Sequence, residues 1–356
     1  MKVPACVALP GKVIEHDNRF KLVMALTLDP QSGYRKGVLR CITSRSGEIG
    51  VKGNVDRSVL HIISGNTLAD FTIGERLTIK GEDELIAHLN PDGLDFLGLE
   101  DPDIWIDEAT GRTHLYFTIP LVDSRSNKLY HSTKTRVSVG HAEGDSLASL
   151  VMTEPVLRAR ERDYANSFAK EVSIAPVNKR GVRLNLFESS DQRKDPFYDQ
   201  TRQKGFTSFS TVRVAITEDM GKPWQWGETV FHPADHKIPW IAEHASPGPL
   251  MSRAFIDVGE GKLLGFMNGR EASIANGKET EYRKFSVGLF IYDYENGKID
   301  WVSPEPLVYD TEAKTITFAS QFIETGNGEG ILYAHVDDSF VRAYTINAEG
   351  LKALLP

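Results

Sequence analysis

The sequence reads Gly98-Leu99-Glu100-Asp101-Pro102-Asp103-Ile104-Trp105-Ile106 and, after a short turn, Thr113-His114-Leu115-Tyr116-Phe117. The pattern predicts two antiparallel strands joined by that turn. Three carboxylates within four residues open the first strand. Like charges oppose one another's ionisation, so this grouping is costly unless it faces water, a cation or a polar ligand. The segment is therefore a candidate functional site.

Similar strand pairs, each opening on polar or small residues, recur about 70 residues apart along the chain. The later pairs are predicted at 170–177 with 182–187, at 248–251 with 254–258 and 262–266, and at 316–323 with 330–335. Outer strands follow some of them, at 211–216 with 224–226 and at 285–292 with 299–301. Four antiparallel strands per repeated unit are typical of a propeller blade.

The segments 20–26 and 37–43 add an N-terminal unit, which brings the number of units to five. We therefore expect an all-β fold, a five-bladed β-propeller formed by one domain over residues 1–356. The last unit is short, so we expect an N-terminal strand to close the ring. Helical periodicity is limited to two short segments, 82–89 and 348–355.

The composition of the chain argues against several classes of partner and cofactor. The chain has 356 residues, 40% of them hydrophobic, and a net charge of −8. A mildly acidic protein attracts neither a phosphate backbone nor an anionic membrane, so we expect no nucleic-acid and no membrane partner. Cys6 and Cys41 show no metal-type spacing, and we expect neither a metal nor a cofactor. Because the start of the chain lacks a continuous apolar segment, we expect a cytoplasmic protein, and a homo-oligomeric state stays open.

Propeller geometry gathers the residues that precede the first strand or follow the second strand of each blade around the axis, on one face. The residues so collected are Arg40, Glu100, Asp101, Asp103, Lys170, Glu171, Glu188, His244, Asn268, Arg270, Asp337 and Asp338. Such a polar, acidic pocket suits a sugar, whose hydroxyls need many hydrogen-bond partners. We expect an oligosaccharide substrate.

The run Gly-Leu-Glu-Asp-Pro-Asp-Ile at 98–104 resembles the Gly-Val-Glu-Asp-Pro-Arg-Ile signature of glycoside hydrolase family 130. That family comprises β-mannoside phosphorylases and β-mannosidases built on five-bladed propellers. Segments similar to its other motifs follow in the same order, and the resemblance covers about residues 95–346. They are Lys170-Glu171-Val172 to Pro176, Gly248-Pro249-Leu250, Tyr282 to Tyr292 with Pro306-Leu307, and Leu332 to Asp338.

The resemblance implies that Asp101 is the general acid, delivering its proton through a sugar hydroxyl. It also implies that Asp338 or Asp337 binds the sugar in the innermost subsite. Where the phosphorylases carry positive or donor groups, this chain has Asp103, Asn268 and Glu188. The carboxylates of Asp103 and Glu188 would repel phosphate at close range.

These departures favour hydrolysis over phosphorolysis. An inverting glycosidase needs an acid and a base about 6.5 to 9.5 Å apart, and Glu171 and Glu188 are the candidates for the base. Three alternatives stay open: a phosphorylase that uses Lys170, Arg40 and Arg270 for phosphate, a propeller that binds a glycan without cleaving it, and an arabinanase-like or fructosidase-like enzyme.

Overall fold

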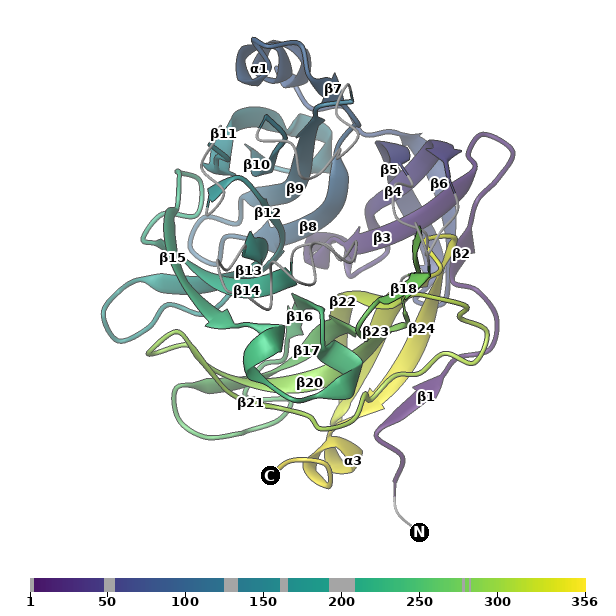
Figure 1. Cartoon of the computed structure of the whole chain (residues 1–356), viewed down its shortest axis with the longest axis vertical. Helices are drawn as coiled ribbons and strands as arrows, with labels where there is room; N and C mark the ends of the chain where they lie inside the picture. The colour runs from purple at the N-terminus through teal and green to yellow at the C-terminus, as the bar shows by residue number, and fades with distance from the viewer. Residues whose placement is uncertain are drawn as a thin grey trace.

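The computed structural model describes residues 3–47, 55–124, 134–160, 166–191, 209–276, 279–281 and 283–356. Strands dominate these residues, and the fold is all-β (Figure 1). The helices are α1 (Glu82–Leu89) and α3 (Ala348–Lys352), with short 3-10 turns at Pro30–Ser32, Leu147–Ser149, Pro233–Asp235 and Pro239–Ile241. None of the helices in the described ranges is long and apolar enough to cross a membrane.

The described strands pair into antiparallel arrays that follow one another along the chain. The first contains β3 (Leu22–Leu28), β4 (Lys36–Ser46), β5 (Val55–Thr67) and β6 (Asp70–Arg76). In the second, β7 (Asp95–Phe96) and β8 (Glu100–Ile106) both pair with β9 (Thr113–Val122), followed by β10 (Arg136–Gly144) and β11 (Val151–Leu157). The third contains β12 (Ala169–Ser173), β13 (Arg183–Asp191), β14 (Phe209–Thr217) and β15 (Gln225–Phe231).

The fourth array contains β16 (His244–Leu250), β17 (Lys262–Arg270), β20 (Phe285–Asp293) and β21 (Lys298–Val302). One parallel pairing, Ser210 with His244, joins it to the third array in a single eight-stranded sheet. The fifth contains β22 (Thr317–Gly326), β23 (Glu329–Val336) and β24 (Phe340–Asn347). A small hairpin, β18 (Ile274–Asn276) with β19 (Glu279–Glu281), stands apart.

The N-terminal strands β1 (Cys6–Ala8) and β2 (Ile14–Glu15) both pair with β24, the last strand of the chain. The first and last segments of the protein thus share one sheet, and in Figure 1 the two termini lie at the same side of the molecule.

The strand pairs expected from the sequence are present, including β8 with β9 and β22 with β23. Helix α1 has the predicted bounds, and α3 begins where predicted. The strand predicted at 254–258 is wrong. The backbone N–H groups of Phe255 and Ile256 donate to the carbonyl of Ser252, so this apolar segment forms a turn whose side chains join the core.

Five strands, β3, β8, β12, β16 and β22, line a central channel of about 180 Å³, and their labels lie around the middle of Figure 1. Each of these strands breaks register with its neighbour, β22 twice and the other four once. At three of the breaks a residue with a side chain has a positive φ: Ala25 at 34°, Asp101 at 47° and Glu171 at 50°. A bulge of this kind bends the strand and redirects a side chain.

Candidate functional site

Residues from all five arrays line a polar cavity of about 230 Å³, and the fourth array contributes from β16 and β20. Its lining residues are Met24, Arg40, Asp56, Glu100, Asp101, Lys170, Glu171, His244, Phe285, Ile316, Phe318, His335 and Asp338. Seven of the residues predicted from the sequence are among them: Arg40, Glu100, Asp101, Lys170, Glu171, His244 and Asp338. Strands far apart in the sequence therefore bring these side chains to one opening.

Asp101 lies at the floor of this cavity and also lines the central channel. Its side chain is 3% exposed. Arg40 donates a hydrogen bond to Asp101 Oδ1 at 2.7 Å, and Lys170 Nζ lies 3.5 Å from Oδ2. Burial alone would raise the pKa of Asp101, but the Arg40 and Lys170 charges hold it well below its usual range. Asp101 is thus an ionised carboxylate.

Glu171 reaches Asp101 from the corresponding bulge of β12. Burial, followed by the negative charge of Asp101, raises the pKa of Glu171 well above its usual range. Lys170 Nζ lies 3.7 Å from Glu171 Oε1. Two interacting carboxyl groups titrate as a unit, and this pair has its pKa values shifted in opposite directions, that of Asp101 down and that of Glu171 up.

Arg40 also anchors Glu100, with Nη2 to Oε1 at 2.8 Å, and its Nε donates to the Ser58 hydroxyl at 2.8 Å. Burial raises the pKa of Glu100 to about 7, against the lowering effect of Arg40. Arg40 therefore bridges both carboxylates of the Glu-Asp-Pro run and fixes their orientation.

Glu188 lies behind the cavity wall, with its side chain only 1% exposed. His244 Nε2, from β16, is 3.1 Å from Glu188 Oε1. Burial alone would raise the pKa of Glu188, but the charges of His244 and Lys170 lower it to about 2. Glu188 does not line the cavity, and its contacts position His244 and Lys170.

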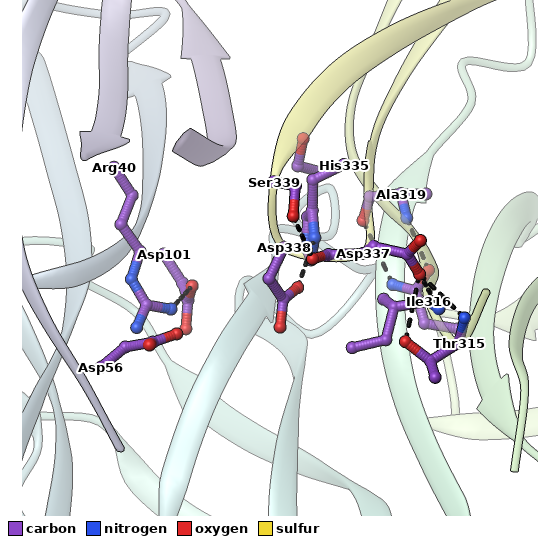
Figure 2. Close-up of polar contacts among 12 residues, drawn as sticks. Arg40, Asp56, Asp101, Thr315, Ile316, Ala319, His335, Asp337, Asp338 and Ser339 are labelled. Atoms are coloured by element: carbon purple, nitrogen blue, oxygen red, sulfur yellow. Dashed lines mark hydrogen bonds and ion pairs between the residues drawn. The ribbon is translucent and has the colours of Figure 1, made fainter. Parts of the chain in front are cut away.

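The wall opposite Arg40 and Asp101 comes from the fifth array (Figure 2). Asp338 Oδ1, in the turn after β23, lies 2.8 Å from His335 Nδ1. Burial alone would raise the pKa of Asp338, but His335 together with the charges of Arg45 and Arg40 lowers it. Asp56 on β5 is held by Arg45 through two bonds of 2.7 and 2.6 Å. Figure 2 shows Asp338 between the Asp337 turn and the group formed by Arg40, Asp101 and Asp56.

Four predicted residues lie elsewhere. Asp103 lines the central channel, where burial raises its pKa to about 7. Asn268 is fully buried and exchanges two hydrogen bonds with the backbone of Ala319. Arg270 contacts Glu243 at 3.1 Å and stacks over Phe285.

The fourth is Asp337, whose carboxylate accepts three backbone N–H bonds of 2.8 to 2.9 Å from Lys314, Thr315 and Ile316 (Figure 2). These bonds fasten the segment before β22 to the turn after β23. The side chain of Asp337 thus holds the backbone in place, whereas its neighbour Asp338 faces the cavity.

The sequence reasoning missed several lining residues: Asp56, His335, Phe285 and Phe318. Its rule selected residues just outside the first two strands of a blade. Asp56 lies on the third strand of its array, and His335 lies inside β23 just ahead of the predicted Asp337 and Asp338. Alternation along β23 does not single out His335, because Tyr333, which points to the same face, packs in the core.

No family model matches the sequence, and no curated protein matches it. Solved structures do match. A glycosyl hydrolase from Bacteroides ovatus shares 16% identity over 96% of this chain and 93% of its own, with a TM-score of 0.65.

Two further structures extend the likeness. A β-1,2-mannobiose phosphorylase from Listeria innocua, solved with β-1,2-mannobiose, shares 13% identity over 99% and 97% of the two chains, with a TM-score of 0.58. An endo-arabinase from Bacteroides thetaiotaomicron shares 14% identity over 95% and 97%, with a TM-score of 0.51. At such identities the likeness establishes the fold, which is all-β and β-propeller-like.

Proposed function

We propose that this protein is a glycoside hydrolase that cleaves a β-mannoside or a related oligosaccharide. The observation that carries the proposal is that the buried carboxyl groups of Asp101 and Glu171, whose pKa values are shifted in opposite directions, line one polar cavity. The similarity in fold to a glycosyl hydrolase and to a β-1,2-mannobiose phosphorylase supports the substrate class. So does the resemblance of residues 98–104 to the family 130 signature.

In this proposal the Asp101–Glu171 pair acts as the general acid. Departure of a sugar alkoxide requires a proton, and a group that is protonated near neutral pH and lies at the cavity floor can deliver it. The resemblance assigns this role to Asp101. In our proposal Glu171 stores the proton and Asp101, fixed by Arg40 and Lys170, forms the other half of a relay.

We propose that the catalytic base lies on the cavity wall opposite Asp101. Glu171 hydrogen-bonds Asp101 directly, so it is far closer than the roughly 6.5 to 9.5 Å that an inverting mechanism needs between its two carboxyl groups. Glu188 is shielded behind His244. We propose Asp338 as the carboxylate that activates water, because it is ionised and lines the cavity opposite Asp101.

We also infer that the five arrays are the blades of a five-bladed propeller that β1 and β2 close by pairing with β24. The five strands around the central channel support this inference. The ring accounts for how residues from 40 to 338 share one cavity.

A phosphorylase is the second candidate, because Arg40 and Lys170 both line the cavity. Both cations are already matched by carboxylates, which favours hydrolysis. The deciding experiment is product analysis on β-linked mannobioses with and without inorganic phosphate, following the anomeric configuration by NMR. We expect phosphate-independent release of α-mannose; a mannose 1-phosphate product would overturn hydrolysis, and binding without turnover on every substrate would indicate a glycan-binding protein.

A further inference from the structure

A second group of chemically active side chains lies at the opposite end of β9 from the cavity. Glu100 pairs with Thr118 at the cavity end of the β8–β9 ladder, whereas His114 lies four residues back along β9. At about 3.4 Å per residue the distance from Thr118 to His114 is roughly 14 Å. The group is therefore separate from the Asp101–Glu171 pair.

The pairing of β9 with β10 puts the group on one face of the sheet. His114 lies directly opposite Glu143, and His141 precedes Glu143 by two residues, so all three side chains project to the same side. The short pattern His-Ala-Glu at 141–143 thus meets a histidine on the adjacent strand.

The ligand atoms of these residues converge. One nitrogen or oxygen atom from each of His114, His141 and Glu143 lies within 4.8 Å of the other two. His114 Nδ1 is 2.9 Å from His141 Nε2 and 3.9 Å from Glu143 Oε2. The two imidazoles are 5% and 0% exposed, while the Glu143 side chain is 33% exposed and leaves one side open to solvent.

Neighbouring residues hold the imidazoles in place. His141 Nδ1 hydrogen-bonds the Thr153 hydroxyl at 2.6 Å, which directs Nε2 toward His114. The ring of Tyr116 packs against both imidazoles. A hydrogen bond from the remote N–H of the histidine to a second residue is the usual support of a metal-binding histidine.

We propose that His114, His141 and Glu143 bind a divalent transition-metal ion, with Zn²⁺ as the fitting probe. Two imidazoles and one carboxylate suit Zn²⁺ and its neighbours rather than Mg²⁺ or Ca²⁺, which prefer oxygen ligands. Solvent completes the coordination on the open side at Glu143. This proposal departs from the expectation, drawn from spacing alone, that the chain holds no metal.

Binding needs a proton to move between ring nitrogens. At 2.9 Å one of the two facing nitrogens donates its N–H to the other, so this proton must pass to the remote nitrogen of the same ring before both lone pairs can bind the ion, and each imidazole keeps one N–H. Two nitrogens about 2.0 to 2.1 Å from one tetrahedral ion lie roughly 3.4 Å apart, so the rings separate by about half an ångström.

The surrounding charges are mixed. Arg112 Nη2 lies 3.3 Å from the other oxygen of Glu143, and this exposed cation opposes a second positive charge. Asp219, in the turn after β14, offsets the positive charge of Arg112. Its carboxylate lies near that of Glu143, because a Cβ placed on Gly221 would be 3.2 Å from Glu143 Oε2 and 3.6 Å from Asp219 Oδ1. The ion would thus link β9 and β10 to the turn of the next array.

The test is Zn²⁺ binding to the full chain without an affinity tag, measured by calorimetry and by competition with a chromophoric chelator. We expect one equivalent of Zn²⁺ to bind. Co²⁺ should give a visible absorption band, and Mg²⁺ and Ca²⁺ should give no binding. His141→Gln should abolish the site, and Glu143→Gln, at a partly exposed position, covers the case in which the buried variant fails to fold.

Two controls separate this site from others on the protein. His88→Gln removes an exposed histidine on α1, and Asp101→Asn alters the cavity acids; both should keep the full equivalent. Thr153→Val should weaken binding about tenfold to a hundredfold, as loss of a supporting hydrogen bond to a metal ligand does. Equal binding by the wild type, His141→Gln and Glu143→Gln, or no stoichiometric binding by the wild type, would overturn the proposal.

Discussion

Replacing Glu171 with Gln should remove the proton that our proposal assigns to the Asp101–Glu171 pair at neutral pH. Gln has nearly the same shape and can still donate an N–H bond to Asp101, but it has no acidic proton. Asp101 cannot replace it, because Arg40 and Lys170 keep its pKa well below the usual range. Loss of general acid catalysis costs about a hundredfold to ten-thousandfold in rate, which is about 2.7 to 5.5 kcal/mol of activation free energy at 1.36 kcal/mol per factor of ten.

The assay compares two substrates across pH. An unactivated mannobiose needs the proton and should lose the full factor, whereas an aryl mannoside with a good leaving group should lose much less. In the wild type, kcat should fall as pH rises through the raised pKa of Glu171, because the pair is then fully ionised; Glu171→Gln should lack this alkaline decline. Glu271→Gln, at a more exposed glutamate paired with Arg283, is the matched control. Hydrolysis of mannobiose by Glu171→Gln within tenfold of wild type would refute the reasoning.

Three substitutions outside the cavity should lower stability, measured by urea unfolding, without changing KM in the folded fraction. Asn268→Ala strands the buried N–H and C=O of Ala319, at a cost of about 2 to 5 kcal/mol, and a raised KM at wild-type stability would restore its role as a sugar ligand. Asp337→Ala deprives three backbone N–H groups of their acceptor and should cost about 2 to 4 kcal/mol; wild-type stability would contradict this structural role. Gly98→Ala puts a Cβ 1.9 Å from the Ser58 carbonyl at a φ of 96°, so we expect a loss of about 3 kcal/mol or more, and an unfolding midpoint equal to wild type would show that the backbone relaxes freely there.

Strand pairing could be predicted from the sequence because each buried pair carries its own signal: an apolar run, a turn and a second run. The pair β8 and β9 has this form and was predicted correctly. The segment 254–258 has the same apolar composition, yet it forms a turn. Its side chains are buried in the core by a different backbone path, and hydrophobicity does not distinguish the two cases.

The sequence could predict which turns contribute to the candidate site, but not which side chain of a turn faces the cavity. Adjacent residues Asp337 and Asp338 share a positive φ and a residue type, but one caps a backbone segment and the other faces the cavity. Asn268 and Asp338 were gathered by the same rule. Only the packing of β17 against β22 shows that Asn268 is occupied by the Ala319 backbone. Direction at a bulge depends on tertiary contacts that the sequence does not display.

The bulges themselves indicate what belongs to the fold and what belongs to the chemistry. Ala25, Asp101 and Glu171 hold comparable positive φ values at the register breaks of β3, β8 and β12. Ala25 has no polar group to place, so the strain at this position cannot be a device for catalysis alone; it accompanies the way these strands turn around the central channel. At two of the three positions a carboxylic acid occupies the redirected side chain, and the two acids meet. The strained backbone, which also occurs at Ala25, thus sets the direction of the side chain. The carboxylic acids at the other two positions, Asp101 and Glu171, supply the proton.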